Sequence, residues 1–342
     1  MKLETKLSKH TLTFKTPGGT SRGVLHSKNS WIIQLFDANH RAVRGTGEAS
    51  IIENLSPEWN EEYEHRLTKI CSAELPASLE SFSQFREIPS LRFALESAYL
   101  DLKNGGNGFC FPSDFTGGKA SIPINGLVWM GDHNYMQNQI EEKLNTGYTC
   151  IKMKVGAIDF ETELEILKSI RKRYSKSEII LRVDANGAFS GRDVMQKLDD
   201  LASLDIHSIE QPVKAGQLEL MQKICLNTPL PVALDEELIS IHDTREKNNL
   251  LQFIKPQFII LKPSLLGGFL SCDEWIAAAE KNRAGWWITS ALESNIGLSA
   301  IAQYTYTKHV RMHQGLGTGQ LFTNNFSSDL CIQHGELWMK SM

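Results

Sequence analysis

The sequence is organised around the run Ile179-Ile180-Leu181-Arg182-Val183-Asp184-Ala185-Asn186-Gly187. Its first five residues are mostly apolar and β-prone, which predicts a buried strand, and a turn signature follows that begins at the carboxylate of Asp184. The same pattern returns in residues 207–212, where Glu210 ends the strand, and in residues 230–236, where Asp235 ends it. Three successive predicted strands therefore each end in an acid.

The spacing between these acids matches one βα unit. About 25 residues separate each acid from the next, which is the length of a strand, a helix and two short loops. The carboxyl ends of parallel strands closed into a barrel meet at one face, and active sites of such barrels lie there. We therefore expect the three acids to converge on one site.

Composition narrows the class of protein. The chain has 342 residues, of which 41% are hydrophobic and 22% charged, and its net charge is −4. No basic run with interleaved aromatic residues suggests nucleic acid as a partner, and no segment has the apolar length of a signal peptide core or a membrane span. The cytoplasm is the expected location. The six cysteines include no CxxC pair, so we expect free thiols.

The first part of the chain is predicted to be an α+β domain covering residues 1–118. Strands are expected at residues 12–15, 31–36 and 43–49, with a turn at residues 37–40. Helical patterns follow at residues 57–70, 78–85 and 90–102. The glycine-rich residues 104–108 end the last helix.

From residue 119 the pattern changes to strands that alternate with amphipathic helices, which is typical of a parallel α/β unit. Strands are expected near residues 122–127, 149–155, 179–184, 206–211, 231–234, 258–261, 286–290 and 313–315. Leu164, Leu167 and Ile170 form one buried stripe among charged residues, as in an outer helix. The predicted fold is an α/β protein with a (β/α)7β TIM-type barrel at residues 119–317, and residues 318–342 are expected to return to the first domain.

Two further strand ends carry lysines. The second barrel strand finishes Lys152-Met153-Lys154, and alternation puts both ammonium groups on one face, toward the barrel axis if Met153 faces the helices. The sixth strand finishes with Lys262. Lysines that point into a barrel are costly unless paired, so the three carboxylates are their expected partners.

Three converging carboxylates suit a hard dication with oxygen ligands, and magnesium is the natural choice. Any one of Asp184, Glu210 and Asp235 could instead be a turn residue or helix cap, and each lysine could be solvated at a sheet rim. Three acids in successive units, with lysines on either side, favour a metal site. Glu236 is expected to support the ligands or to lie at the surface, because adjacent strand residues face opposite ways.

The charged strand ends belong to one set of segments: Lys152-Met153-Lys154, Asp184-Ala185-Asn186, Glu210-Gln211-Pro212, Asp235-Glu236, Lys262-Pro263 and Ser290-Ala291-Leu292-Glu293-Ser294. This set, which spans the barrel over residues 120–320, resembles the muconate-lactonizing-enzyme subgroup of the enolase superfamily. The first domain, with Gly45-Thr46-Gly47-Glu48-Ala49, is similar to the capping domain of that superfamily.

The resemblance implies a metal-dependent enzyme with a lysine base, the combination that the superfamily uses. Lys154 would be the base that removes a proton next to a carboxylate, Lys152 its electrostatic neighbour, and Lys262 a cation that stabilises the enediolate. The resemblance further implies Mg2+, with Mn2+ as a substitute, bound by the three acids. It implies substrate contacts from Ser290, Ser294, Thr318, Arg22 and Asn186.

Residues 315–325 narrow the implied reaction. Their sequence, Gly-Leu-Gly-Thr-Gly-Gln-Leu-Phe-Thr-Asn-Asn, resembles the tail of members that eliminate water from 2-succinyl-6-hydroxy-2,4-cyclohexadiene-1-carboxylate and form 2-succinylbenzoate for menaquinone synthesis. Dipeptide-epimerising relatives place acids after strand eight, whereas this chain offers backbone amides and Thr318, which suit an anion. Relatives that dehydrate sugar acids use a histidine where this chain has Thr289-Ser290.

Four alternatives remain open at the level of sequence. An N-acylamino-acid (N-succinylamino-acid) racemase would use the same site, because lysines for two-sided proton transfer are present, and another lyase or epimerase of the subgroup would also fit. A barrel that binds an anionic metabolite without turnover would use the lysines only to balance buried acids. A Schiff-base aldolase using Lys262 would not need three acids, and metal dependence would distinguish it.

The segment from Pro17 to Gly23 is too long and glycine-rich for a tight hairpin, which predicts a loop. Since the capping domain of the superfamily closes the site, we expect the segment Gly18 to Gly23 to order over the barrel mouth when ligand binds, with Arg22 near an anionic group. The alternative is a surface loop with a solvated Arg22. The oligomeric state stays open.

Overall fold

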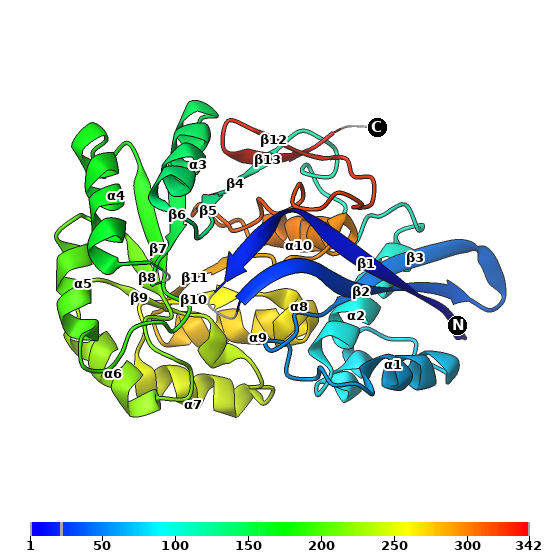
Figure 1. Ribbon diagram of the computed structural model, residues 1–342. Helices are drawn as coiled ribbons and strands as arrows, with labels where there is room; N and C mark the ends of the chain where they lie inside the picture. Colours follow the sequence, from blue (N-terminus) through cyan, green and yellow to red (C-terminus); the bar gives the residue numbers. More distant parts are fainter. Residues whose placement is uncertain (1, 21–22, 157, 341–342) are drawn as a thin grey trace.

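The computed structural model describes residues 2–20, 23–156 and 158–340. It contains an N-terminal antiparallel sheet with its helices and a curled parallel sheet covered by helices on its outer face (Figure 1). This arrangement agrees with the predicted α/β barrel and α+β cap.

The N-terminal sheet has the order β1 (Leu3–Thr20), β2 (Gly23–Asp37) and β3 (His40–Ser50). It is followed by α1 (Tyr63–Ser72), a 3-10 helix (Glu80–Phe85) and α2 (Pro89–Lys103). Helix α2 packs so closely on β3 that a Cβ atom at Gly45 or Gly47 would lie 1.9 Å from a carbonyl oxygen of the helix. The two glycines of the capping-domain motif are therefore required for this contact.

The expectation of a long loop at residues 17–23 is wrong. Strands β1 and β2 pair as far as Thr20 and Gly23, so only two residues connect them. The register shifts between Thr13 and Gly18, and this irregularity accommodates Pro17 in β1, an edge strand where a missing N–H costs no ladder hydrogen bond. Arg22 lies outside the described residues.

The parallel sheet has the order β11-β10-β9-β8-β7-β6-β5. Its strands are β5 (Gly126–Val128), β6 (Cys150–Lys154), β7 (Ile180–Asp184), β8 (Ser208–Glu210), β9 (Val232–Leu234), β10 (Phe258–Leu261) and β11 (Gly285–Ile288). Its helices are α3 (His133–Asn145), α4 (Phe160–Arg173), α5 (Val194–Ala202), α6 (Leu218–Asn227), α7 (Thr244–Ile254), α8 (Pro263–Leu266), α9 (Gly268–Lys281) and α10 (Asn295–Thr307).

The predicted eighth strand consists of isolated bridges. Gln314 pairs with Ile124, and Gly315 pairs with Thr289, both in parallel fashion. The segment thus connects the end of β11 to the chain before β5 and closes the ring of strands. The predicted first strand is divided in two, because residues 121–123 form a separate strand, β4 (Ser121–Pro123), which pairs with the C-terminal hairpin.

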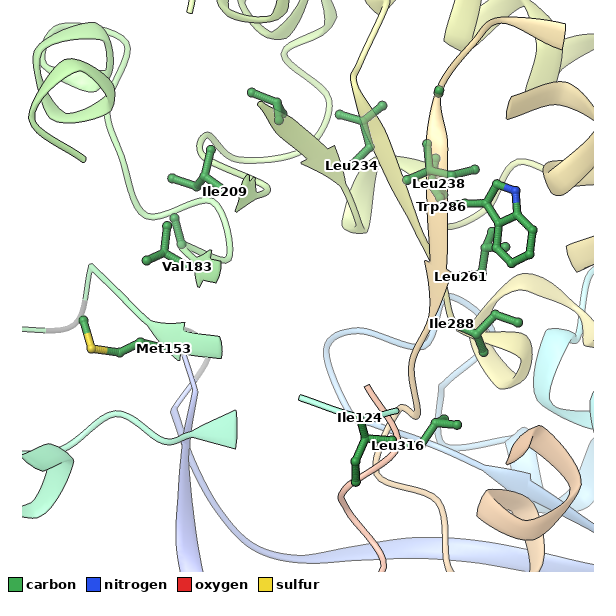
Figure 2. Packing of buried hydrophobic residues seen from close by; sticks show 14 of the residues in the cluster. Ile124, Met153, Val183, Ile209, Leu234, Leu238, Leu261, Trp286, Ile288 and Leu316 are labelled. Atoms are coloured by element: carbon green, nitrogen blue, oxygen red, sulfur yellow. The ribbon is translucent and has the colours of Figure 1, made fainter. Parts of the chain in front are cut away.

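The barrel core lies between the strands and the outer helices. Figure 2 shows one buried side chain from each of six successive strands, and these point outward from the ring: Met153, Val183, Ile209, Leu234, Leu261 and Ile288. The predicted stripe of α4, with Leu164, Leu167 and Ile170, is buried in the same core. Since Met153 faces outward, Lys152 and Lys154 must face the barrel interior, as expected.

The C-terminal segment divides between the two domains. The Lys15 N–H donates to the Leu321 carbonyl oxygen at 2.8 Å, and the Thr323 N–H donates to that of Thr13 at 2.9 Å. Residues 330–339 instead form the hairpin β12 (Leu330–Gln333) and β13 (Glu336–Met339), whose strand β13 pairs with β4. Residues 321–326 thus contact β1, whereas the hairpin pairs with β4. In the described part of the chain, no helix has the length and apolarity needed to cross a membrane.

Candidate active site

A cavity of about 280 Å3 lies at the carboxyl ends of the barrel strands. From the barrel it is lined by the ends of β6 and β7 and by residues that follow β9, β10 and β11. From the N-terminal domain it is lined by Gly23, Val24 and Leu25 of the β1–β2 hairpin and by residues 52–55 after β3. Figure 1 shows the hairpin reaching from its own sheet to the barrel. Both domains therefore enclose the cavity.

Strand register brings the predicted lysines and acids together. Lys154 is paired with Asp184, and Asp184 with Glu210, across β6, β7 and β8. The Nζ atoms of Lys152 and Lys154 lie 3.0 Å and 3.1 Å from Asp184 Oδ2, and Lys152 also binds Glu210. Because parallel strands in register align their ends, the two lysines of β6 lie beside the acid that ends β7, which lies beside the acid that ends β8.

The remaining acid and lysine of the predicted set also lie in contact. Asp235 follows β9, and Lys262 follows β10 and forms an ion pair with it. Asp235 and Glu210 are almost completely buried, and each contacts a lysine that lines the cavity. We call these six residues the mouth cluster: Lys152, Lys154, Asp184, Glu210, Asp235 and Lys262.

Charge balance in the mouth cluster shifts the pKa values of its members. Burial would raise the pKa of Asp184, but the lysine ammonium groups, Lys152 first, outweigh burial and hold it below its usual range. Burial raises the pKa of Glu210 to about 7, with repulsion from Asp184 and Asp235 added, although Lys152 opposes the shift. Burial opposes the charge of Lys152 and Lys262, yet the adjacent carboxylates raise the pKa of both.

Glu210 is incompletely satisfied. Its Oε2 contacts Lys152, whereas its buried Oε1 has no hydrogen-bond partner among the described residues. Among those residues, no group of three or more His, Cys, Asp and Glu side chains is arranged to hold a metal ion, and each predicted ligand instead contacts a lysine. A buried carboxylate oxygen without a partner is costly, so a further cation or hydrogen-bond donor at Oε1 of Glu210 would stabilise the site.

Two polar residues beside the mouth cluster also line the cavity. Asn186, with φ of 44°, accepts a hydrogen bond from Lys154 and donates Nδ2–H to Glu236 Oε1 at 3.2 Å. Glu236 is buried and is therefore not a surface acid. Strand β9 ends at Leu234 and a 3-10 helix begins at Glu236, so strand alternation does not apply to this residue.

The predicted substrate-binding hydroxyls separate into two groups. Ser290 and Thr318 line the cavity, and their hydroxyl oxygens lie 2.5 Å apart. Ser294 is instead the N-cap of α10, where its hydroxyl accepts from the Ile296 N–H and donates to Glu48. The expected substrate contact of Ser294 is thus replaced by a structural role, because the side chain belongs to a helix N-terminus.

Glu48 connects the two domains. Its Oε1 accepts hydrogen bonds from the Ser30 hydroxyl at 2.6 Å and the Ser294 N–H at 2.9 Å, and its Oε2 accepts from the Ser294 hydroxyl and the Gly297 N–H. Lys28 donates to the carbonyl oxygen of Leu292, a cavity residue, at 2.8 Å. We call the set the junction cluster: Lys28, Ser30, Glu48, Ser294 and Gly297.

Comparison with known proteins places the chain in a family. Residues 135–339 match the family model described as enolase C-terminal domain-like. Over 366 aligned positions the chain is 45% identical to the o-succinylbenzoate synthase of Desulfotalea psychrophila, with 98% of each chain covered. The crystal structure of MenC from that organism superposes with a TM-score of 0.87 at 41% identity, covering 99% of this chain and 100% of that one.

The chain therefore belongs to the enolase superfamily, and the predicted fold is confirmed. Within the superfamily, its full-length similarity is to an o-succinylbenzoate synthase, which confirms the resemblance seen in the sequence. An N-succinyl-L-Arg/Lys racemase of Bacillus cereus is more distant, at 24% identity over 87% of this chain and 82% of its own. The L-Ala-D/L-Glu epimerase of Bacillus subtilis shares the fold, with a TM-score of 0.83 at 21% identity and coverage of 99% of this chain and 97% of its own.

Proposed function

We propose that the chain is a carbon–oxygen lyase that converts 2-succinyl-6-hydroxy-2,4-cyclohexadiene-1-carboxylate to 2-succinylbenzoate and water, as a step in menaquinone biosynthesis. The observation that carries this proposal is the 45% identity to an o-succinylbenzoate synthase along the whole chain. The cavity supports it, because lysines and carboxylates converge where a carboxylate substrate would have to lose a proton.

Lys154 is the proposed base. It lies at the end of β6, lines the cavity and is held by Asp184 and Asn186. Its neutral amine would take the proton from C1, next to the ring carboxylate, and the electron pair would move into that carboxylate. In a syn elimination the base and the departing hydroxyl share one face. The electron pair would then return from the carboxylate to form the C1–C6 double bond as the C6–O bond breaks, and the Lys154 ammonium would give its proton to the leaving hydroxyl, which departs as water.

Lys262 and Lys152 have electrostatic roles in this proposal. Lys262 follows β10, whereas Lys154 ends β6, so the two cations approach the cavity from different parts of the ring. Lys262 would stabilise the negative charge that develops on the carboxylate oxygens. Lys152 balances Asp184 and Glu210 and places positive charge beside the base.

The three carboxylates of the mouth cluster fit a divalent metal ion by their chemistry, although in their present arrangement each contacts a lysine and they do not converge on one point. Asp184, Glu210 and Asp235 would hold it, since three carboxylates are the oxygen donors that Mg2+ or Mn2+ prefers, and Oε1 of Glu210 is a buried acceptor without a partner among the described residues. When bound, the metal would neutralise charge on the substrate carboxylate. Dipeptide epimerases of Enterococcus faecalis and Cytophaga hutchinsonii have been crystallised with Mg.

The capping domain would exclude water from this chemistry. We place the division between the cap and the barrel at residues 1–118 and 119–317, on the basis of the change from antiparallel to parallel strands. The β1–β2 hairpin and residues 52–55 already line the cavity, so a small movement of the hairpin would suffice to close it around a ligand.

A second candidate function is racemisation of N-succinylamino acids. Two lysines, Lys154 and Lys262, line the cavity from different strands, and racemisation needs one proton donor or acceptor on each face of the substrate. The similarity to the Bacillus cereus racemase is only 24%, and the full-length similarity at 45% is to a synthase, so dehydration is favoured.

One assay separates the two functions. The purified protein with Mg2+ is incubated with the cyclohexadiene substrate and, separately, with N-succinyl-L-amino acids. Formation of 2-succinylbenzoate, at a kcat/KM well above that for racemisation, is the expected result. Racemisation without dehydration would establish the second function, and failure to act on either substrate would refute both.

A further inference from the structure

The cavity has a charged end and a neutral end. Lys154, Asp184 and Lys262 define the charged end, whereas Ser290 and Thr318 are uncharged and come from the segments after β11 and after the closing bridge. The proposed substrate has the same division, with a ring carboxylate at one end and a succinyl arm, bearing a ketone and a second carboxylate, at the other. Since proton removal occurs beside the ring carboxylate, the arm would lie along an uncharged part of the lining, and the segments of Ser290 and Thr318 offer one that carries hydroxyl groups.

Asn125 lies at this neutral end. It immediately precedes β5 and is held by its backbone, because its N–H donates to the Gln314 carbonyl oxygen at 2.9 Å. The preceding residue, Ile124, is fully buried in the barrel core, so Asn125 faces the opposite side and lines the cavity. A Cβ atom at Gly317 would lie 3.6 Å from the Asn125 carbonyl oxygen, which places Asn125 directly beside the Gly317-Thr318 segment.

The side chain of Asn125 has an unsatisfied polar atom. The residue is only 4% exposed, and its Oδ1 has no hydrogen-bond partner among the described residues. A buried amide oxygen without a partner costs stability and gives nothing to the fold. Because no protein group holds Oδ1, a half-turn about the Cβ–Cγ bond lets the amide present either its oxygen or its NH2 group to a ligand.

Asn125 also separates the cavity from a second one. A neighbouring cavity of about 350 Å3 lies against the first, and both are lined by Asn125, Leu127, Trp129, Gly317 and Thr318. The second cavity is lined by Lys15 and by Lys143, whose ammonium group pairs with Glu142 at 3.1 Å, so Lys15 is the cation there that could face an anionic group. An arm that extended from the charged end toward the second cavity would therefore pass Asn125, which borders both cavities.

We propose that Asn125 is a specificity-determining residue whose Nδ2–H group donates a hydrogen bond to an oxygen of the succinyl arm. The proposal rests on the proposed function. All oxygens of the arm are acceptors, so the amide must turn its NH2 group toward the arm. In this arrangement Asn125 recognises the part of the substrate that does not react and takes no part in proton transfer.

The test compares two ligands and two variants by calorimetric titration in the presence of Mg2+. Asn125→Leu is expected to weaken binding of 2-succinylbenzoate by roughly 10- to 100-fold, as for one lost hydrogen bond to a charged group, and to leave the affinity for benzoate unchanged. Asn125→Asp is expected to weaken binding of 2-succinylbenzoate more than Asn125→Leu does, because the introduced carboxylate repels the oxygens of the succinyl arm. In turnover, both variants should raise KM more than they lower kcat.

A stability measurement distinguishes recognition from a structural role. Without ligand, Asn125→Leu should melt at or above the temperature of the wild type, because the variant removes an unsatisfied buried amide. The matched control is Asn282→Leu. The Asn282 amide donates to Asn248 and to the Ala278 carbonyl oxygen, so this change should lower the melting temperature without affecting KM.

Several outcomes overturn the proposal. Donation to the arm would be refuted if Asn125→Leu lost affinity equally for 2-succinylbenzoate and benzoate, or if its affinity for 2-succinylbenzoate were unchanged. Tighter binding of 2-succinylbenzoate by Asn125→Asp would also refute it. If the wild type turns over the cyclohexadiene substrate and the variants match it, only the role of Asn125 fails. If the wild type neither turns over that substrate nor binds 2-succinylbenzoate, the proposed function fails and the role of Asn125 fails with it.

Discussion

The mouth cluster and the junction cluster both bury carboxylates and lysines, but they satisfy them differently. In the junction cluster, Glu48 accepts four hydrogen bonds, two on each oxygen, from serine hydroxyls and backbone N–H groups. In the mouth cluster, Glu210 contacts one lysine through one oxygen, and its other oxygen has no partner in the described part of the chain. Both oxygens of Glu48 therefore have hydrogen-bond partners, whereas only one oxygen of Glu210 does in the described part of the chain.

This difference in hydrogen bonding indicates a structural role for Glu48 and a ligand-binding role for Glu210. Glu48 is held by donors that belong to the backbone and to a helix N-terminus, so it joins the two domains. Glu210 is held by a single flexible cation, and its raised pKa of about 7 shows that burial is only partly compensated. A buried carboxylate oxygen without a hydrogen-bond partner is a candidate ligand for a bound metal ion. Substituting Glu210 and Glu48 in turn tests this difference.

The largest expected effect comes from Glu210→Gln. Loss of a metal ligand should lower kcat/KM at least about 1,000-fold, several kcal/mol of transition-state stabilisation. The melting temperature should stay at or above that of the wild type, because a neutral amide replaces an incompletely satisfied buried acid. Steady-state kinetics and thermal melts measure both. As a control, Glu48→Gln should lower the melting temperature; if Glu210→Gln destabilises the protein more than this control does, the contrast between the clusters is wrong.

The next effect separates the two cavity lysines. Lys154→Ala should lower turnover by roughly 100- to 10,000-fold, the contribution of a general base, and should abolish exchange of the α-proton with deuterated solvent. Lys262→Ala should lower turnover but retain measurable exchange, because its role is electrostatic. Mass spectrometry of recovered substrate measures the exchange. Wild-type exchange in Lys154→Ala would show that another group is the base.

A smaller effect is expected at the junction cluster. Glu48→Ala leaves the Ser294 and Gly297 N–H groups without their acceptor and should destabilise the protein by about 3 kcal/mol or more, since each buried donor left unsatisfied costs about 1–3 kcal/mol. Urea denaturation monitored by circular dichroism measures the loss. Stability equal to that of the wild type would mean that the domains dock without this carboxylate.

The smallest expected effect is a pH dependence of stability caused by a second buried acid, Glu96, which lies between the N-terminal domain and the barrel. Glu96 of α2 is buried, pairs with Arg92 and accepts the Phe269 N–H of α9. Burial raises its pKa to about 7 although Arg92 opposes the shift. Between about pH 4.5 and 7 the folded protein keeps the Glu96 proton, whereas the unfolded chain releases it. The contribution of this protonation to the free energy of unfolding is therefore fully present below about pH 4.5 and is lost as the pH rises to about 7.

The comparison with Glu96→Gln isolates this contribution. The stability of the wild type relative to the variant should fall, by up to about 3 kcal/mol, between pH 4.5 and 7. Denaturant melts at several pH values measure the difference. A difference that is constant over this range, or that grows with pH, would contradict the protonated state of Glu96.

The sequence predicted those features that depend on local pattern. Strand runs ending in Asp184 and Glu210 placed the acids, because parallel strands in register bring their ends together whatever the details of packing. Alternation oriented Lys152 and Lys154 for the same reason.

Features that depend on contacts distant in the sequence were not predicted. Ser294 was expected at the substrate, but its partner Glu48 lies 246 residues earlier in the chain and in another domain, and no local pattern records that contact. The β1–β2 hairpin was mistaken for a loop because glycine and proline usually mark loops, whereas an edge strand tolerates both. Asn125 has no unusual local pattern, and only its burial without a partner distinguishes it.

The central claim is that the mouth cluster is a metal-dependent site for dehydration, and metal removal tests it most directly. The rate of 2-succinylbenzoate formation is measured in the purified protein, after treatment with excess EDTA, and after addition of Mg2+ beyond the chelator. The rate should fall to background with EDTA and return with Mg2+, while circular dichroism stays native throughout. Formation of 2-succinylbenzoate at an undiminished rate in EDTA would contradict the claim.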